Sequence, residues 1–198
     1  MKNLFLFLTL VLIFQLKAQD NNNLVAMGNQ AMNEGNFKGA ERFYLSALAK
    51  DNRNYLLYTY IGFSLHKQNY FSKADSFFQI SINNDSTLSK AFWYKGMNLV
   101  KMKKDSLAIL SYKKFIQLER KRGGNSLVEA NSQIAKCYER ILRKDGLYSF
   151  QIDDMLNHLN DILIEDLSNP RVPVIENFIE HIKQKRPASQ TGKWLLTQ

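Results

Sequence analysis

The sequence predicts an all-α fold, an α-solenoid of stacked antiparallel helix pairs. Three kinds of residue predict it, because each recurs with a period of 34 residues. Glycine and alanine recur at two fixed phases, at Gly28, Gly62, Gly96, Ala40, Ala74 and Ala108. Aromatic side chains hold a third phase, at Tyr44, Phe78 and Tyr112. Self-similarity at a fixed period of about 20 to 50 residues is typical of stacked repeats.

Three repeat units fit this period, and they cover residues 21–54, 55–88 and 89–122. Each unit contains two helical patterns of about a dozen residues. In the second unit, Ile61 and Leu65 lie on the apolar stripe of one helix, and Ala74 and Phe78 on that of the next. Between them lies a turn at residues 67–70. Such turns contain Asn or Gly because these residues tolerate left-handed backbone.

The in-phase glycines and alanines indicate close packing between the two helices of a unit. We expect each glycine to face the alanine of the partner helix where the two helices approach most closely. A larger side chain there would hold the helices apart, and overpacking typically costs about 1–3 kcal/mol. Glycine within a helix costs about 1 kcal/mol relative to alanine, so its recurrence indicates a steric requirement.

Over residues 21–122 the chain resembles the tetratricopeptide repeat (TPR) family, which carries small and aromatic residues at these phases. It departs from the family pattern where Asn52, Ser86 and Arg120 replace the usual proline, and at Lys95 and Phe115. The resemblance implies an array of helix pairs that binds a segment of a partner protein and has no enzymatic activity.

The period breaks after Arg122, at Gly123 and Gly124. Beyond that point the sequence predicts a degenerate fourth helical pair over residues 125–168, a capping helix over 170–186 and a flexible tail over 187–198. Stacked repeats need an end helix with a polar outer face, and the 170–186 segment fits that role. Within the tail, Trp194 to Leu196 form an apolar segment that is able to dock.

The N-terminal residues 1–18 have the features of a signal peptide. Lys2 gives the positive start, Leu4 to Phe14 the apolar stretch, and Ala18 a small residue at the expected cleavage site. The apolar stretch is shorter than the roughly 20 residues of a transmembrane helix. We therefore expect an exported bacterial protein, periplasmic or associated with the cell envelope. An uncleaved anchor is the alternative.

The charge of the chain is basic and unevenly distributed. There are 27 Lys and Arg against 18 Asp and Glu, a formal net charge of +9. Basic residues concentrate between Lys101 and Arg122, whereas acidic residues concentrate between Gln151 and Glu180. Because basic surfaces attract anionic partners, peripheral binding to anionic surfaces or polymers through residues 101–122 is one functional hypothesis. A solvated face without a partner is the plainer interpretation, and nucleic acid is not an expected partner.

No pattern in the sequence indicates catalysis, a cofactor or a metal site. There is no glycine-rich phosphate loop, no histidine pair with metal-ligand spacing and no cysteine pair. The histidines are dispersed, at His66, His158 and His181. Cys137 is the single cysteine, and we expect it to be buried, with an intermolecular disulfide or a reactive thiol as the alternatives.

The TPR resemblance implies that the first helices of the units line a concave groove that binds a peptide or helix. The residues at its groove positions form the candidate partner-binding site: Asn29, Phe63, His66, Lys67, Lys90, Trp93, Met97 and Lys101. Aromatic residues at the centre of such a site act as anchors, and lysines favour peptides with carboxylates. The alternative is that a C-terminal segment of the same chain covers the groove.

TPR domains that bind chaperone C-termini hold the terminal carboxylate in a clamp of Lys, Asn and Arg side chains. Asn29 and Lys90 match that set, but Val25, Phe63 and Tyr94 stand at other clamp positions. We therefore do not expect this mode of binding. A third functional hypothesis is self-assembly through the solenoid ends, at the helices predicted around residues 152–163 and 174–182.

Overall fold

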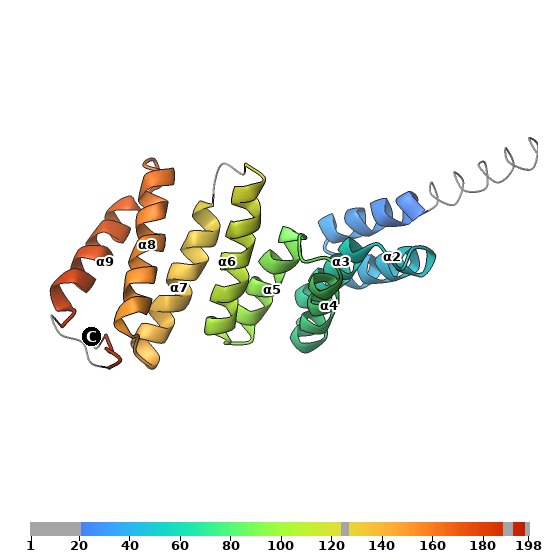
Figure 1. Cartoon of the computed structure of the whole chain (residues 1–198). Coiled ribbons are helices and arrows are strands. Elements are labelled where there is room, and N and C mark those ends of the chain that lie inside the picture. Colours follow the sequence, from blue (N-terminus) through green and yellow to red (C-terminus); the bar gives the residue numbers. More distant parts are fainter. Residues whose placement is uncertain (1–20, 124–126, 188–191, 197–198) are drawn as a thin grey trace, which may run out of the picture. The chain divides into compact units, whose positions relative to one another are not determined.

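The computed structural model describes residues 21–123, 127–187 and 192–196. Within these ranges the secondary structure is α-helical apart from one isolated β-bridge, which confirms the predicted all-α fold (Figure 1). The predicted signal peptide, residues 1–18, lies outside the described residues. The same is true of residues 124–126 and of the tail residues 188–191 and 197–198.

The helices follow one another through short connections. Residues 21–33 are helical, and the following helices are α2 (Phe37–Lys50), α3 (Tyr55–Lys67), α4 (Phe71–Asn84), α5 (Ser89–Lys101), α6 (Asp105–Lys121), α7 (Val128–Lys144), α8 (Ser149–Glu165) and α9 (Val172–Lys185). Two helices fall in each of the ranges 21–54, 55–88 and 89–122, in which the sequence predicts a repeat unit. The ranges of α7 and α8 lie within the segment predicted to be the degenerate pair.

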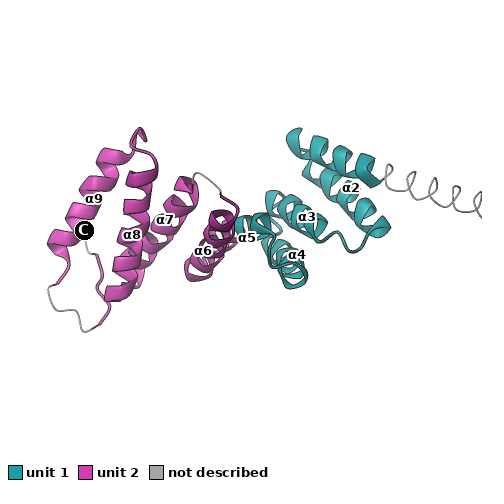
Figure 2. Cartoon of the chain, turned by 45° about the horizontal axis from the view of Figure 1, so that its top comes forward, with its two compact units in different colours: residues 1–94 teal, residues 95–198 magenta. Residues whose placement is uncertain are grey.

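The described chain forms two compact units, with the boundary between Tyr94 and Lys95, inside α5 (Figure 2). The first unit contains the helical residues 21–33, α2, α3, α4 and the start of α5. The second contains the end of α5 and the helices α6 to α9.

The turns within the helix pairs contain a left-handed residue at the same position of each repeat. The φ angle is 74° at Gly35, 65° at Asn69 and 58° at Lys103. The next N–H reaches back five residues, so that Tyr70 donates to the Leu65 carbonyl at 2.9 Å. This bond satisfies a carbonyl at the helix end, as in a Schellman motif. Lys103 differs from Gly35 and Asn69, because a lysine side chain has no special tolerance for the left-handed conformation.

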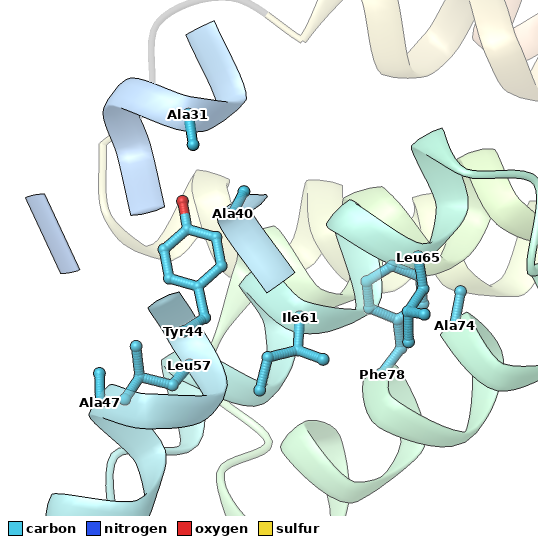
Figure 3. Close-up of a cluster of buried hydrophobic side chains, with 9 residues drawn as sticks. All are labelled: Ala31, Ala40, Tyr44, Ala47, Leu57, Ile61, Leu65, Ala74 and Phe78. Atoms are coloured by element: carbon cyan, nitrogen blue, oxygen red, sulfur yellow. The ribbon is translucent and has the colours of Figure 1, made fainter. Parts of the chain in front are cut away.

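The core of the first unit contains the buried rings of Tyr44 and Phe78 among small and branched apolar side chains (Figure 3). Both rings also lie against a repeat glycine. A Cβ atom added to Gly62 would lie 2.7 Å from Cε1 of Phe78 and 3.2 Å from the carbonyl oxygen of Ala74. The glycine therefore makes room mainly for the aromatic ring, and the backbone near Ala74 is its second neighbour. The expected direct pairing of glycine and alanine describes only the second of these contacts.

The same relation recurs in the other repeats. A Cβ atom added to Gly28 would meet the Tyr44 ring, and one added to Gly96 would lie 2.6 Å from Cε1 of Tyr112. The alanines of the second phase, Ala40, Ala74 and Ala108, are fully buried. The 34-residue period of the sequence therefore reflects one packing contact, between a glycine and an aromatic ring of the two helices of a pair. This contact occurs in both units.

In the second unit, α6 packs on α7, α7 on α8 and α8 on α9. Helix α9 buries Ile175, Ile179 and Ile182. Val174, the first residue of the predicted 174–182 helix, is apolar as well, but it is 68% exposed. The buried face of α9 is therefore narrower than the pattern indicated.

Part of the C-terminal tail, predicted to be flexible, is docked on the second unit. Leu147 and Trp194 form a β-bridge in which each N–H donates to the other's carbonyl at 2.9 Å. Leu196 is buried. A Cβ atom on Gly146, whose φ is 71°, would lie 2.9 Å from the Trp194 carbonyl oxygen. These contacts involve the segment Trp194 to Leu196, which the sequence marked as able to dock, and they lie beside the α7–α8 connection.

Candidate functional site

Phe63 of α3 and Tyr94 of α5 form a ring stack in the first unit. Their centroids are 4.0 Å apart and their planes differ by 13°. Both side chains are half-buried and pack against the apolar core of the unit. Sequence analysis assigned Phe63 to the groove as an apolar anchor. Part of its side-chain surface is instead buried in packing within the first unit.

Two exposed lysines lie over aromatic rings of the same region. The Nζ atom of Lys67 is 5.6 Å from the Phe63 centroid and 5.7 Å from the Phe37 centroid. The Nζ atom of Lys90 is 5.9 Å from the Tyr60 centroid. A cation within about 6 Å of a ring face is attracted to the ring, by roughly 0.5–1 kcal/mol at exposed sites. The lysines therefore have a preferred position beside the rings while their charges remain in solvent.

Tyr60 completes this group of rings, which we name the aromatic cluster (Tyr60, Phe63 and Tyr94). Tyr60 lies beside Tyr44, with ring centroids 5.4 Å apart. Burial raises the pKa of Tyr44 to about 12, and it also raises that of Tyr94, although Lys90 acts in the opposite direction there. Both phenols therefore keep their protons near neutral pH and remain hydrogen-bond donors.

Asn29 is exposed, and its side chain is already engaged within the first unit. The hydroxyl of Tyr44 donates to its Oδ1 atom at 2.8 Å. The Nδ2 group of Asn29 is the part of the side chain left to contact a ligand. Asn29 thus links the buried ring of the repeat to the candidate surface.

His66 does not lie where the sequence placed it. The prediction assigned it to the groove surface, but it is only 6% exposed. Its ring lies 6.1 Å from that of Phe63 and 5.5 Å from that of Phe71. The imidazole therefore packs among aromatic rings, and this burial removes it from the candidate binding residues.

The remaining candidates lie along α5. Lys90 is exposed and Trp93 is half-buried, both in the first unit. Met97 is half-buried and Lys101 is exposed, both in the second unit. The structure therefore brings Phe63, Lys67, Lys90 and Trp93 into one compact unit, and assigns Met97 and Lys101 to the other.

The sequence-based site omitted Tyr60 and Tyr94, although a signal for them exists. They are 34 residues apart and so occupy the same phase of the repeat. The first repeat has Ala26 at this phase, so the aromatic residue does not recur in all three repeats. Two tyrosines at one phase, outside the phase of the core aromatics, mark a surface on which rings from successive repeats lie close together.

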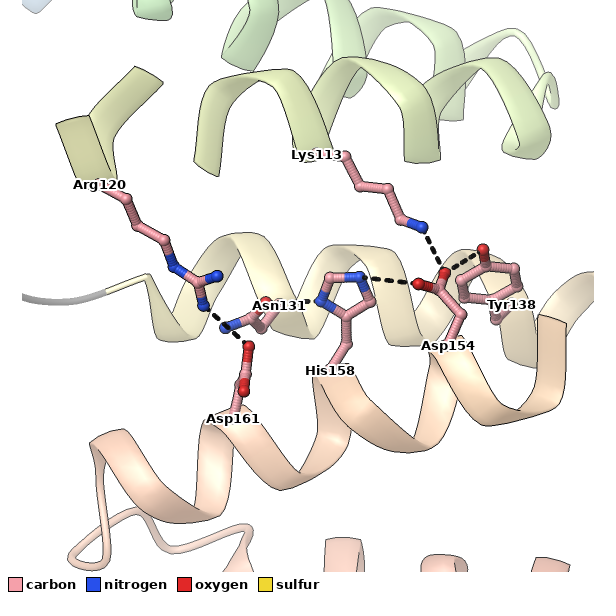
Figure 4. A network of polar contacts seen from close by, with 7 residues as sticks. All are labelled: Lys113, Arg120, Asn131, Tyr138, Asp154, His158 and Asp161. Carbon is pink, nitrogen blue, oxygen red and sulfur yellow. Dashed lines mark hydrogen bonds and ion pairs between the residues drawn. The ribbon is translucent and has the colours of Figure 1, made fainter. Parts of the chain in front are cut away.

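In the second unit, two basic residues of the segment 101–122, Lys113 and Arg120, are paired with the acidic helix α8 (Figure 4). Lys113 of α6 lies 2.5 Å from Asp154, and Arg120 lies 3.0 Å from Asp161. These pairs take two cations out of the basic segment 101–122. The two charge clusters were treated separately in the sequence, but the fold places one against the other.

Asp154 is the hub of a polar network between α6, α7 and α8 (Figure 4). It accepts hydrogen bonds from Lys113 and from the hydroxyl of Tyr138. Burial acts to raise the pKa of Asp154, but the two hydrogen bonds outweigh it and hold this pKa below its ordinary value. Asp154 therefore stays ionised and joins three helices.

His158 extends this network, and its environment favours the neutral ring. Its Nδ1 lies 2.8 Å from Oδ1 of Asn131, so the ring N–H donates to this carbonyl oxygen. Its Nε2 is 3.9 Å from Asp154. Burial lowers the pKa of His158, against the opposing charge of Asp154. The imidazole thus connects α8 to α7 as a neutral group.

Cys137 is buried, as the sequence predicts. Burial raises the pKa of its thiol to about 12, and the neighbouring Arg140 lowers it only in part. A thiol with such a pKa is a weak nucleophile at neutral pH, because the thiolate is the reactive form.

Within the described residues, no group of three or more His, Cys, Asp or Glu side chains is arranged to hold a metal ion. In the same part of the chain, no helix has both the length and the apolar character needed to cross a membrane.

Solved structures share this arrangement of helices. The first TPR domain of Spaghetti (RPAP3), bound to an HSP90 peptide, is 21% identical, matches 62% of this chain and 96% of its own, and gives a TM-score of 0.57. The chain has the tetratricopeptide repeat fold. YrrB, a TPR protein described as having an unusual peptide-binding site, matches 82% of this chain and 77% of its own at 18% identity, with a TM-score of 0.64.

A third TPR structure, the TPR2B domain of yeast Sti1 in its complex with an Hsp70 peptide, is 16% identical. It matches 63% of this chain and 98% of its own, with a TM-score of 0.58. No protein-family model matches the sequence, and no curated protein matches it. At these identities the structural likeness establishes the TPR fold class, an α-solenoid of helix pairs.

Proposed function

We propose that this TPR protein is a non-enzymatic adaptor of the bacterial cell envelope that binds a peptide or helix of a partner protein. The binding surface is the aromatic cluster with Lys67, Lys90 and Trp93. One observation carries the proposal: exposed ammonium groups lie over half-buried ring faces of the first unit. Such a surface suits a segment that combines an apolar side chain with a carboxylate.

The aromatic cluster argues against a chaperone-type ligand held by a carboxylate clamp. Phe63 and Tyr94 stand at clamp positions, and their rings stack on each other. Asn29 matches the clamp set, but its Oδ1 accepts the hydrogen bond from Tyr44. Peptides from chaperones occupy two of the similar TPR structures. We expect this chain to select an internal or helical segment instead.

The proposed location rests on the N-terminal residues 1–18 and their signal-peptide pattern. N-terminal sequencing of the protein purified from an envelope fraction tests it. A mature chain that begins at Gln19 supports export with cleavage. An intact Met1 in the envelope membrane supports an uncleaved anchor, and recovery from the cytoplasm alone would contradict the location.

The adaptor function is tested by in-cell crosslinking and pull-down from the envelope fraction. The variant Lys67→Ala with Lys90→Ala removes the two ammonium groups that lie over rings of the aromatic cluster and leaves the rings in place. The matched control is Lys38→Ala with Lys73→Ala, which removes the same charge from the same unit. Lys73 also lies over a ring, 5.4 Å from the centroid of Tyr70.

We expect the wild type and the control to capture the same partner, and the Lys67–Lys90 variant to lose it. Equal capture by both variants would place the interaction elsewhere. Loss of capture in both would show that total charge, not the aromatic cluster, drives the association.

Two alternatives remain as hypotheses. The first is binding of an anionic polymer through residues 101–122. The pairing of Lys113 and Arg120 with α8 argues against it, because these two cations are already neutralised within the chain. Self-assembly is favoured by exposed apolar side chains of the α8–α9 region, among them Ile164, Leu167 and Val174. A mass measurement in solution across protein concentrations separates self-assembly from adaptor binding.

A further inference from the structure

A basic cavity lies within the second unit, where it is lined by residues of the segments 100–107 and 140–145. It has a volume of about 1020 Å³, and we name it the edge cavity. Its lining comes from the end of α5, the start of α6 and the end of α7. It shares Lys101 with the sequence-based groove site but contains none of the residues of the aromatic cluster.

The lining of the edge cavity is strongly basic. Six cationic side chains line it: Lys101, Lys103, Lys104, Arg140, Arg143 and Lys144. Against these stand only two lining carboxylates, Asp105 and Asp145. The imbalance of 6 − 2 = 4 positive charges falls on one small part of the surface. Like charges held this close repel one another, and an anionic ligand would relieve that repulsion.

The two arginines of the cavity are already paired. Arg140 donates to both carboxylate oxygens of Asp105, with Nε at 3.1 Å from each, and Asp105 is 16% exposed. Arg143 pairs with Glu139 at 3.0 Å. Among the described residues, the lysines of the cavity make no ion pair. Lys101, Lys103, Lys104 and Lys144 are therefore the cations available to a ligand.

The acidic residues of α8 do not supply the missing anions. Asp154 and Asp161 pair with α6, and Asp153 pairs with Arg186 at 2.5 Å. These three carboxylates are thus engaged elsewhere in the second unit and do not neutralise the lysines of the edge cavity. An anionic partner would supply the complementary charge.

The wall of the edge cavity also includes apolar side chains. Val100, Leu107 and Ile141 line it, and Leu107 is 50% exposed. A simple anion, such as phosphate or a polyanionic polymer, would leave this apolar surface uncovered. A peptide that alternates acidic and apolar side chains would cover it and also neutralise the lysines.

We propose that the edge cavity binds an acidic peptide segment of a partner protein, with carboxylates at the four lysines and an apolar side chain against Leu107. This inference does not rest on the proposed function of the aromatic cluster. It gives the protein a second peptide-binding surface, in which lysine charge and not ring contact is the main determinant.

The test measures the fluorescence anisotropy of a short fluorescein-labelled peptide of repeated Glu-Glu-Leu on titration with the full chain. Two further peptides separate the contributions: repeated Gln-Gln-Leu lacks the charge, and repeated Glu-Glu-Ser lacks the apolar side chain. Heparin and phosphatidylglycerol vesicles serve as competing anions. We expect Glu-Glu-Leu to bind most tightly and to resist competition best.

Matched variants assign the binding to the edge cavity. The triple variant Lys101→Gln, Lys103→Gln, Lys144→Gln should weaken peptide binding about tenfold, since exposed charge pairs each contribute a few-fold. Its control removes three exposed lysines outside the cavity, Lys121→Gln, Lys183→Gln and Lys185→Gln, and should change binding about twofold at most, because distant charges are screened.

A second pair of variants tests the apolar wall. Leu107→Ser should weaken binding about threefold, because a partly exposed leucine contributes part of its burial energy. The control is Leu110→Ser, on the same helix and 63% exposed but outside the cavity lining, and it should leave binding unchanged. All titrations are repeated in the Lys67→Ala, Lys90→Ala background, in which the aromatic cluster lacks its two cations, so that the remaining binding reports on the edge cavity alone.

Four results would each overturn the proposal. The first is absence of Glu-Glu-Leu binding to the wild type, and the second is equal weakening by both triple variants. The third is equal affinity for Glu-Glu-Ser, which would indicate a site for anions alone. The fourth is displacement of the peptide by heparin or vesicles at trace concentration, which would indicate a polymer or membrane ligand.

Discussion

The ring of Phe78 occupies the space that a side chain at Gly62 would need, with Cε1 only 2.7 Å from the position of an added Cβ atom. The two residues lie on the two helices of one pair, α3 and α4. The glycine and the aromatic ring therefore form a single steric unit, and a change in one has to be accommodated by the other.

Gly62→Ala should lower the free energy of unfolding by about 1–3 kcal/mol, because the new methyl group overpacks the interface. This loss should exceed the gain of about 1 kcal/mol in helix propensity. Urea unfolding of the single variants and of Gly62→Ala combined with Phe78→Leu measures it. We expect the smaller side chain at position 78 to relieve the overpacking. The double variant should therefore lose less free energy of unfolding than the two single variants lose in sum. Additive effects would contradict the contact.

Lys103→Gly should raise the free energy of unfolding by about 0.5–1 kcal/mol. Lys103 has a φ of 58°, a conformation that costs a side-chain-bearing residue about 1–2 kcal/mol. Thermal and urea unfolding measure the gain. The control is Lys104→Gly, where φ is −101° and glycine brings no relief, so that stability should fall. Equal effects at the two positions would show that backbone strain is not the cause.

Stability should fall as the pH drops from about 7 to 5, and His158 should be one source of this dependence. Burial lowers the pKa of His158 in the folded protein, so the unfolded chain takes up a proton first, near pH 6.5. The stability is thus fully present above about pH 6.5 and is lost as the pH falls toward the folded pKa.

His158→Gln should make this pH dependence shallower, as measured by urea unfolding at a series of pH values. His181→Gln is the matched control, because His181 is exposed on α9. It should keep the dependence of the wild type. An unchanged slope in His158→Gln would exclude His158 as its origin.

Trp93→Ala should weaken capture of the protein partner with little change in helicity or melting temperature. Phe63→Ala should behave differently, because it removes a ring stacked on Tyr94, and its loss should lower stability by about 1–3 kcal/mol. Circular dichroism on heating and the crosslinking assay compare the two. A large drop in melting temperature for Trp93→Ala would show that Trp93 belongs to the core.

The fold was predictable because its information is local and periodic. Gly28, Gly62 and Gly96 mark the same contact in each repeat, so a single period identifies the architecture. The left-handed turn residues at Asn69 and Lys103 follow the same period. Even the lysine, which has no intrinsic preference for that conformation, adopts it because the helices on both sides impose the turn.

The candidate site was less predictable because burial depends on neighbours outside the period. His66 occupies a groove position in the sequence pattern, but rings from α3 and α4 enclose it. The pairing of Lys113 with Asp154 spans 41 residues and joins segments with no common repeat. The docking of Trp194 against Leu147 likewise depends on tertiary structure.

The ion pairs from α6 to α8 have a consequence for how the second unit unfolds. Stacked repeats approximate one-dimensional chains in which each element is stabilised only by its immediate neighbours, so that ends fray separately. Lys113–Asp154 and Arg120–Asp161 connect helices that are not consecutive, passing over α7. Loss of α8 would therefore remove contacts from α6 as well as from α7. Helices α6, α7 and α8 should open together as one cooperative block, and hydrogen exchange should show them with a common protection.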